Sequence, residues 1–346
     1  MCSINIDDIN FDTPILQIVS RKNVPLKFSQ CNFQNYIPDK KYPTQMRAKE
    51  QLMAFKQKME DFNSKKRCCS KTLNKLFKIN KKPNNVYIDG VFGVGKTHLL
   101  SSIGNKYKGK AIFISFSELM YLIAYFDLLS VVEEMSKFQI VLLDEFELDD
   151  PGDAMMGINF VRELSKTDSV IVTTSNTTPT SLGGRKFDMM VFKERIGKLI
   201  NYFDIILIDG KDYRIEEKPN IQKSQSNLKK LFQQYKTKNR KKLYVTFDDL
   251  LKKLRSVHPV RYINFNNTID AIFIENLRKF TDDELLDALR FSYLTDVLYY
   301  GDVDIFISSK IDLWHMFSED LRDGKFKNKI SRCISRISEK GLFIEL

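Results

Sequence analysis

The sequence predicts an α/β protein built around a parallel sheet, and three observations lead to this prediction. Between residues 86 and 216, short apolar runs typical of strands alternate with stretches whose apolar residues recur at helical spacing. The run at 140–144 (IVLLD) is apolar up to its last residue, as expected of a strand in the middle of a parallel sheet. A glycine-rich loop joins the first strand to the helix that follows it. Strands that alternate with helices in this way favour a parallel sheet.

The elements are expected in a regular order along the chain. Apolar residues recur at helical spacing over 45–62, so a helix is expected before the sheet begins. The next elements are strand 86–89, helix 96–105, strand 111–116, helix 117–135, strand 140–144, helix 154–165, strand 170–175 and strand 203–209. After a break in composition come strand 271–276, helix 282–299, strand 303–309 and then helices to the end.

Four regions are predicted from this pattern. At about 150 residues per domain, a chain of 346 residues holds two domains or one large elaborated domain. The regions are an N-terminal lead-in and helix at 1–80, a core at 81–217, a basic linker at 218–243 and an α/β C-terminal region at 244–346. Residues 219–242 hold eight Lys or Arg and no acidic residue. A solvated linker is the favoured interpretation of this charge run, and phosphate binding is the alternative.

The composition, 43% hydrophobic and 29% charged, is ordinary for a soluble protein. The longest apolar stretches, around 119–126 and 204–208, are far shorter than the ~20 residues that span a bilayer. The acidic N-terminus has no signal-peptide pattern, so we expect no export and no stable membrane insertion. Five cysteines without a C-x-x-C pair indicate reduced thiols, and we therefore expect a cytoplasmic protein.

The histidine content and the net charge limit which metals and partners the sequence predicts. Only three histidines are present and none lies near two cysteines, so a zinc site is not expected. The net charge of +11 makes acidic partners such as nucleic acids plausible. A composition that is simply rich in lysine explains the same charge equally well.

The glycine-rich loop matches the pattern G-x-x-x-x-G-K-[ST], which is the phosphate-binding P-loop. Its context fits, because it follows a strand and opens a helix whose positive dipole end faces the bound anion. Glycines let the backbone N–H groups approach phosphate oxygens, and the lysine neutralises the β and γ phosphates. The predicted ATP-binding residues are Gly90, Val91, Phe92, Gly93, Val94, Gly95, Lys96 and Thr97. His98 follows directly and is included as a candidate, with packing at the helix start as the alternative.

Two acidic residues end the apolar strand at 140–144, some 48 residues after Lys96. In P-loop enzymes a strand-terminal aspartate orders the shell of the Mg²⁺ ion, so Thr97 and Asp144 are the predicted metal ligands. Glu145 is the predicted general base for the attacking water, a role worth about 10²–10⁴ in rate. Asn176 follows the strand at 170–175 and is the predicted residue that holds this water, with a polar loop start as the alternative.

Several segments resemble the ZapE family of AAA+-related ATPases, which includes bacterial cell-division proteins and mitochondrial relatives. The specific string is DEFELDDPGDAMM at 144–156, and the likeness spans nearly the whole chain. Further segments that resemble the family are YPTQ (42–45), TTSNTTP (173–179), GGRKF (183–187), FDIILIDGKDYR (203–214), RFSYLTDVLYYGDVDIFISS (290–309) and RCISRI (332–337). The resemblance implies a P-loop NTPase (AAA+-related) parallel sheet core with an α/β C-terminal extension.

The same resemblance implies roles for four residues outside the P-loop. It places Gln45 near the nucleotide base and makes Arg185 the candidate arginine finger, which would act between subunits of a homo-oligomer, with a surface arginine in a turn as the alternative. Arg332 and Arg336 would lie near the phosphates or at a subunit interface.

The expected function is hydrolysis of Mg-ATP coupled to remodelling of a protein client. By resemblance, the client would be a division filament or a membrane-protein subunit. The alternative is a replication initiator or helicase loader, since GVGKTHLLSSIGN at 93–105 resembles that class as well. DNA binding is not favoured, because no helix-turn-helix pattern follows the core. A nucleotide-binding scaffold without turnover is disfavoured by the intact Glu145.

Overall fold

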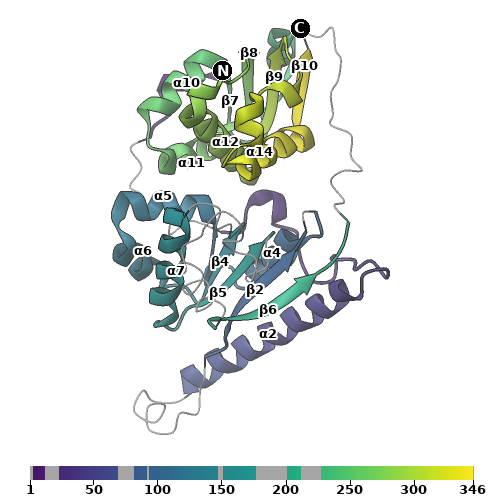
Figure 1. Cartoon of the computed structure of the whole chain (residues 1–346), viewed down its shortest axis with the longest axis vertical. Helices are drawn as coiled ribbons and strands as arrows, with labels where there is room; N and C mark the ends of the chain where they lie inside the picture. Colours follow the sequence, from purple (N-terminus) through teal and green to yellow (C-terminus); the bar gives the residue numbers. More distant parts are fainter. Residues whose placement is uncertain are drawn as a thin grey trace. The chain divides into compact units, whose positions relative to one another are not determined.

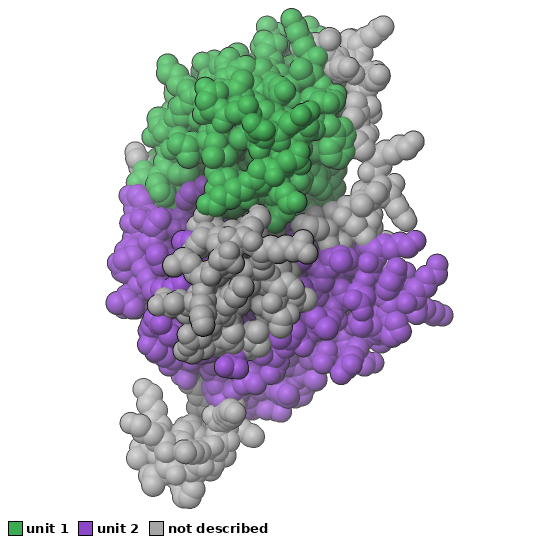
Figure 2. Space-filling model, viewed as in Figure 1, with its two compact units in different colours: residues 1–18, 25–27, 215–346 green, residues 19–24, 28–214 purple. Residues whose placement is uncertain are grey.

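The computed structural model describes residues 3–11, 23–68, 82–91, 93–146, 151–176, 201–211 and 227–345, with the backbone alone described at 65–68, 151 and 345. The chain divides into two compact units (Figure 1, Figure 2). The central unit comprises Val19–Val24 and Phe28–Arg214. The C-terminal unit comprises Met1–Ile18, Pro25–Lys27 and Ile215–Leu346. Each unit contains one parallel sheet with its own hydrophobic core.

The central unit holds a five-stranded sheet in the order β3-β4-β5-β2-β6, with every pair parallel. Its strands are β2 (Asn85–Gly90), β3 (Ala111–Ser115), β4 (Ile140–Asp144), β5 (Val170–Ser175) and β6 (Phe203–Ile208). Its helices are η2 (Leu26–Phe28, which straddles the boundary between the units), α2 (Pro43–Cys68), α4 (Lys96–Lys106), α5 (Phe116–Phe126), α6 (Leu128–Met135) and α7 (Pro151–Ser165). The predicted α/β class with a parallel sheet is therefore confirmed.

Burial along the strands explains why the middle of the sheet reads as continuous apolar runs. Every residue of β3, β4 and β5 is buried, because helices cover both faces of these strands. β6, at the edge of the sheet, alternates buried and exposed residues instead. Before the sheet, α2 begins with a proline at its first position and buries a stripe of residues three or four apart. The stripe comprises Ala48, Leu52, Phe55 and Met59.

The predicted helix at 117–135 is two helices, and Asp127 explains the break. Its backbone has φ of +91°, which a continuous α-helix cannot accommodate. Its side chain accepts a hydrogen bond of 2.9 Å from the backbone N–H of Ser130 and so caps α6. Asp127 is thus the N-cap of a second helix within a stretch that is apolar enough to suggest one.

The C-terminal unit holds the second sheet, in the order β1-β7-β8-β9-β10 and again entirely parallel. Its strands are β1 (Ser3–Ile4), β7 (Lys241–Thr246), β8 (Ile269–Leu277), β9 (Asp304–Ser309) and β10 (Gly341–Glu345). Its helices are η1 (Ile6–Asp8), α9 (Leu228–Gln234), α10 (Phe247–Ser256), η3 (Pro259–Tyr262), α11 (Ile263–Thr268), η4 (Asp282–Glu284), α12 (Leu285–Tyr300), η5 (Leu313–His315), α13 (Glu319–Asp323) and α14 (Lys327–Lys340). Among the described residues, no helix has both the length and the apolarity to cross a membrane.

The N-terminal residues are distributed differently from the predicted region 1–80. β1 pairs with β7 and so belongs to the C-terminal sheet, whereas α2 packs in the central unit. Lys253 anchors the N-terminal segment by an ion pair of 2.9 Å with Asp7, and Arg261 donates to the carbonyl of Phe11. A two-residue strand has no sequence signal of its own, because its stability comes from the edge that it completes.

The region predicted as a basic linker, 218–243, is ordered where the structure describes it. It contains α9 and the start of β7. Lys242 donates to the carbonyls of Phe232 and Tyr235 and so caps the end of α9. Arg240 pairs with the buried carboxylate of Asp270 at 2.7 Å. Basic residues in this stretch therefore stabilise local structure, and residues 227–243 belong to the folded C-terminal unit instead of forming a solvated linker.

The end of the chain also departs from the prediction of helices alone. Gly341–Glu345 forms β10, which pairs with β9 along its whole length. The strand follows α14 directly, and the sequence GLFIE is too short for its period to be recognised. The resulting sheet is covered by α9 on one face through an aromatic row of Tyr244, Phe273 and Phe306, in which the last two rings stack at 4.3 Å.

Candidate nucleotide site

The carboxyl ends of β2, β4 and β5 meet at one edge of the central sheet. Asp89 at the end of β2 lies opposite Ser175 at the end of β5, and Leu143 of β4 lies opposite Thr173. This register brings the P-loop, the acidic end of β4 and the start of the loop after β5 to the same edge. Ligands of open α/β sheets bind at such an edge.

The glycines of the P-loop are required by close contacts and by backbone conformation. Gly93 and Gly95 have φ of +77° and +86°, which side-chain-bearing residues rarely adopt. A Cβ on Gly95 would lie 2.8 Å from the ring of Tyr36, and one on Gly90 would lie 2.3 Å from the carbonyl oxygen of Ile208. The loop is therefore a tight cradle that only glycine fits, as phosphate approach to backbone amides requires.

Lys96 lies at the centre of this cradle. Its side chain is largely buried, and its ammonium donates to the carbonyls of Gly90 at 2.7 Å and Val91 at 2.6 Å. Lys96 is also the first residue of α4, whose N-terminus has neither a side-chain cap nor an acidic residue in its first turn. The positive end of the helix dipole and the ammonium thus point to one place, which suits a phosphate chain.

Thr97 and Asp144 form a pair of oxygen ligands suited to Mg²⁺. The Thr97 hydroxyl lies 3.2 Å from each carboxylate oxygen of Asp144, and Asp144 is 1% exposed. Mg²⁺ prefers hard oxygen ligands and retains several waters, so one carboxylate and one hydroxyl beside a phosphate chain suffice. These two residues would hold the ion, which neutralises charge on the transferring phosphate.

Glu145 follows Asp144 in a left-handed conformation, with φ of +58°. This conformation costs a non-glycine residue roughly 1–2 kcal/mol. The backbone N–H of Glu145 donates to the hydroxyl of Thr174 at 2.9 Å, and that hydroxyl donates in turn to Asp144. Thr174 was not among the predicted site residues. The only signal for it in the sequence was a hydroxyl residue near the end of the strand at 170–175, which follows the strand that ends in Asp144.

Asn176 and Asp89 complete the same edge. Asn176 directly follows β5 and is half-buried at this edge, and its contact with the attacking water stays a prediction. Asp89 was not predicted. It is buried at the end of β2, and burial raises the pKa of its carboxyl group, against the opposing influence of Lys96 and the Gly90 amide. A carboxylate here lies close to the lysine that neutralises the phosphates.

The chain before α2 packs on the P-loop. The Tyr36 hydroxyl donates to the carbonyl of Val94 at 3.2 Å, and its ring lies 5.6 Å from that of His98. His98 Nε2 contacts the Asn32 carbonyl and the Asn35 side chain at 3.1 and 2.9 Å. His98 thus fixes this segment to α4, which supports the packing role over contact with the nucleotide.

Gln45 is buried and both ends of its amide are engaged. Its Nε2 donates to the carbonyl of Asp209 at 3.0 Å, and its Oε1 accepts from the N–H of Asp39 at 2.9 Å. Gln45 therefore ties the segment before α2 to the carboxyl end of β6, next to Val94. A place near the nucleotide agrees with the resemblance, and base recognition by this amide stays a prediction.

The remaining predicted residues fall elsewhere. Phe92 and Arg185 lie outside the described residues. Arg332 and Arg336 are buried between α12 and α14 of the C-terminal unit, where both pair with Asp296. The Arg336 guanidinium also lies 4.7 Å from the centre of the Tyr300 ring. An arginine buried with a carboxylate partner is not available to an external phosphate, so the predicted phosphate or interface role is wrong for both.

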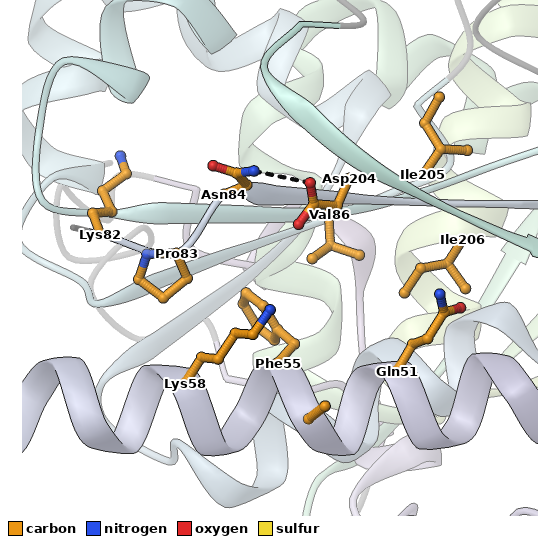
Figure 3. A pocket seen from close by; sticks show the side chains of 11 residues that line it. Gln51, Phe55, Lys58, Lys82, Pro83, Asn84, Val86, Asp204, Ile205 and Ile206 are labelled. Carbon is orange, nitrogen blue, oxygen red and sulfur yellow. Dashed lines mark hydrogen bonds between the residues drawn. The ribbon is translucent and has the colours of Figure 1, made fainter.

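A separate cavity of about 420 Å³ lies at the opposite end of these strands, between α2 and the starts of β2 and β6 (Figure 3). Three of the polar residues that line it, Lys82, Asn84 and Asp204, have partners within the protein. Lys82 donates to three carbonyls at the end of α7 and beyond, and Asn84 donates to Asp204 at 2.9 Å. The cavity is thus distinct from the phosphate cradle, which lies at the carboxyl ends of the strands.

Comparison with known proteins agrees with this geometry. A family model described as AFG1-like ATPase matches residues 28–246 and 225–340. The chain belongs to the AFG1-like ATPase family. As an AFG1-like ATPase it is an enzyme that binds and hydrolyses ATP, and the match extends over both units. The cradle, the oxygen ligands and the acidic strand end described above are the groups that this chemistry needs.

Solved structures similar to this AFG1-like ATPase share low identity with it. The DnaC helicase loader matches at 15% identity and a TM-score of 0.38, covering 53% of this chain and 99% of that one. DnaI matches at 18% and 0.40, covering 54% and 93%. AMPPCP-bound DnaA from Aquifex aeolicus matches at 17% and 0.36, covering 54% and 52%.

Proposed function

We propose that the chain couples ATP hydrolysis to the remodelling of a protein client, as in ZapE-like proteins. The observation that carries the proposal is that the nucleotide site is confined to one of the two units. The candidate hydrolytic residues lie in the central unit, while the C-terminal unit is part of the same family match and its sequence has no second P-loop. A second folded unit without a nucleotide site is free to bind a partner whose state the ATPase cycle changes.

The charges of the C-terminal unit favour a protein client over a nucleic acid. Many of its basic residues are neutralised within the unit, and so contribute little to an external electrostatic footprint. Among the described residues, the lysines and arginines paired with carboxylates there are Lys27, Lys229, Arg240, Lys253, Arg255, Arg278, Arg322, Arg332, Arg336 and Lys340. Counted from the sequence, this unit holds 25 Lys or Arg and 22 Asp or Glu, so it contributes only a small part of the chain's net charge of +11.

Turnover measurements with defined partners test the proposal. ATP hydrolysis by the purified chain is measured alone, with single-stranded DNA, with a purified division-filament protein and with a detergent-solubilised membrane-protein subunit. We expect a protein to raise the turnover and DNA to leave it unchanged within about twofold. Stimulation by single-stranded DNA, with no response to either protein, would overturn the proposal and favour the helicase-loader alternative.

A substrate trap identifies the client. Glu145→Gln with ATP is expected to retain the client that wild-type enzyme releases, while Lys96→Ala serves as the control that cannot load nucleotide. A protein retained by the trap and absent from the control is then purified and added to the turnover assay. Retention without stimulation of the wild-type enzyme would count against coupling.

We also propose that the active form is a homo-oligomer in which Arg185 acts across subunits. An arginine finger stabilises charge in the transition state and is worth about 10³–10⁵ in turnover. Arg185→Ala mixed with Lys96→Ala should therefore recover part of the activity, since one supplies the site and the other the finger. Wild-type turnover by Arg185→Ala alone would place the finger elsewhere, and Arg195 becomes the next candidate.

A further inference from the structure

Thr174 contacts three consecutive residues at the acidic end of β4. Its hydroxyl donates to Asp144 and accepts from the backbone N–H of Glu145 at 2.9 Å. Its carbonyl accepts from the backbone N–H of Phe146 at 2.7 Å. A hydroxyl has one proton to donate and lone pairs to accept, so this one side chain can bond the Asp144 carboxylate and the Glu145 backbone amide at the same time. Thr174 is 1% exposed, and bulk water cannot replace it.

Glu145 depends on such a contact because its conformation is not one that glutamate prefers. With φ of +58°, it lies in the left-handed region, where residues persist only if their surroundings hold them. The hydrogen bond to Thr174 fixes the amide on the N-terminal side of Glu145. The hydrogen bond from the Phe146 N–H to the Thr174 carbonyl fixes the amide on the C-terminal side of Glu145. The two bonds together determine the direction in which the Glu145 side chain leaves the backbone.

We propose that Thr174 is a positioning residue for ATP hydrolysis, which holds Glu145 in the conformation that directs its carboxylate toward the attacking water. The proposal rests on the ATPase activity of the family and on Glu145 as the general base. It does not depend on a client. Thr174 acts through the backbone of Glu145 and not by contact with the nucleotide or the attacking water.

Thr173 provides a matched control on the same strand. It is equally buried and its hydroxyl donates to the carbonyl of Leu143 at 2.8 Å, with no contact to an acidic side chain. Thr173→Val and Thr174→Val each remove one buried hydroxyl and preserve the shape of the side chain. A merely structural role for Thr174 predicts the same effects for both variants.

The experiment compares kcat, nucleotide affinity and thermal stability for these variants. We expect Thr174→Val to lower kcat about 10- to 100-fold, because a misplaced catalytic group loses rates of this order. Affinity for a fluorescent ATP analogue should stay within about threefold of wild type. Thr173→Val should keep kcat within about threefold, and Thr174→Ser, which retains the hydroxyl, should recover most of the activity.

A double variant tests the route of the effect. Glu145→Gln alone is expected to hydrolyse ATP slowly, and Glu145→Gln with Thr174→Val should be no slower within about twofold, since the base that Thr174 positions is already gone. Additive losses would overturn the proposal. So would equal loss of kcat in the two valine variants, failure of the serine variant to recover, or wild-type turnover by Glu145→Gln.

Discussion

The two units contain sheets of the same size and direction, yet among the described residues the candidate phosphate cradle lies at an edge of the central sheet. Both have five strands, and all strand pairs in both are parallel. The strand orders differ. From β7 to β10 the C-terminal sheet adds each strand next to the previous one. In the central sheet the chain leaves β2, returns to it through β3, β4 and β5, and then crosses to β6 on its other side.

This difference in order decides where a ligand can bind. Right-handed crossovers that always step the same way place their helices on one face and leave no crevice between them. A sheet in which neighbouring connections leave in opposite directions has a switch point, and a crevice opens there at the carboxyl ends. The P-loop and the loop that starts at Asn176 leave from the adjacent strands β2 and β5. Strand order, rather than the number or direction of the strands, thus distinguishes the edge with the candidate nucleotide site from the corresponding edge of the C-terminal sheet.

The helix starts show the same contrast. α4 begins at Lys96 after a left-handed glycine, with no side-chain cap and no acid in its first turn. α10 begins after Thr246, whose hydroxyl accepts from the N–H of Asp249 at 3.2 Å, and its first turn carries Asp248 and Asp249. At such a start, the cap bonds a free backbone N–H group and the acidic residues offset the positive end of the helix dipole. Of these two helix starts, that of α4 is the one left open to an external anion.

The largest effect is expected for Lys96→Ala, which removes the positive charge at the centre of the cradle. Hydrogen bonds to charged groups are worth about 1.5–3 kcal/mol each, so nucleotide binding should weaken by 100-fold or more. Titration with a fluorescent ATP analogue measures this. Lys106→Ala, at the far end of the same helix, is the control and should bind normally. Unchanged affinity in Lys96→Ala would mean that the nucleotide site lies elsewhere. It would also contradict the assignment of the site to the edge of the central sheet.

Glu145→Gln is expected to separate binding from turnover within the central unit. The amide keeps the shape of the side chain and cannot accept a proton. Turnover should fall about 10²–10⁴-fold while the affinity for ATP is retained. Glu133→Gln, an exposed glutamate on α6, is the matched control. Turnover within threefold of wild type would exclude Glu145 as the base.

Asp296→Ala tests the claim that the late arginines are structural. The change leaves Arg332 and Arg336 buried without their common carboxylate, which should cost about 3–5 kcal/mol of stability. Trp314 is the only tryptophan, so its fluorescence reports unfolding of the C-terminal unit alone. Asp302→Asn, which breaks the more exposed pair with Lys340, should cost less than about 1 kcal/mol. Equal stability of the two variants would contradict the assignment.

The smallest effect is expected for the stability of the C-terminal unit when the pH is lowered. Hydrogen bonds from Arg278 hold the pKa of Glu284 at about 2, below its usual value near 4.5, although burial opposes this. Because the folded-state pKa is depressed, the stabilisation is present above pH 4.5 and is lost as the pH falls toward 2. Arg278 is partly exposed, so we expect about 1 kcal/mol. Trp314 fluorescence measured from pH 5 to 2.5 should show a steeper loss of stability in wild type than in Glu284→Gln.

The sequence by itself determined the elements whose causes are local. The P-loop, the apolar strand ending in Asp144 and Glu145, and most strands and helices were predicted within a few residues. Their signals are glycine conformation, hydrophobic period and charge at the end of a strand, all of which act over a few neighbouring residues. The family resemblance carried the prediction further and placed Gln45 in the neighbourhood of the P-loop.

Only the tertiary structure decided the features that depend on distant partners. β1 is a strand because it completes the edge of β7, some 240 residues away. Arg332 and Arg336 are buried because Asp296 on another helix neutralises both. Thr174 matters because strand order places β5 beside β4, which brings its hydroxyl to Asp144 and Glu145. Pairing and burial are set by which segments meet in space, and no local pattern records that choice.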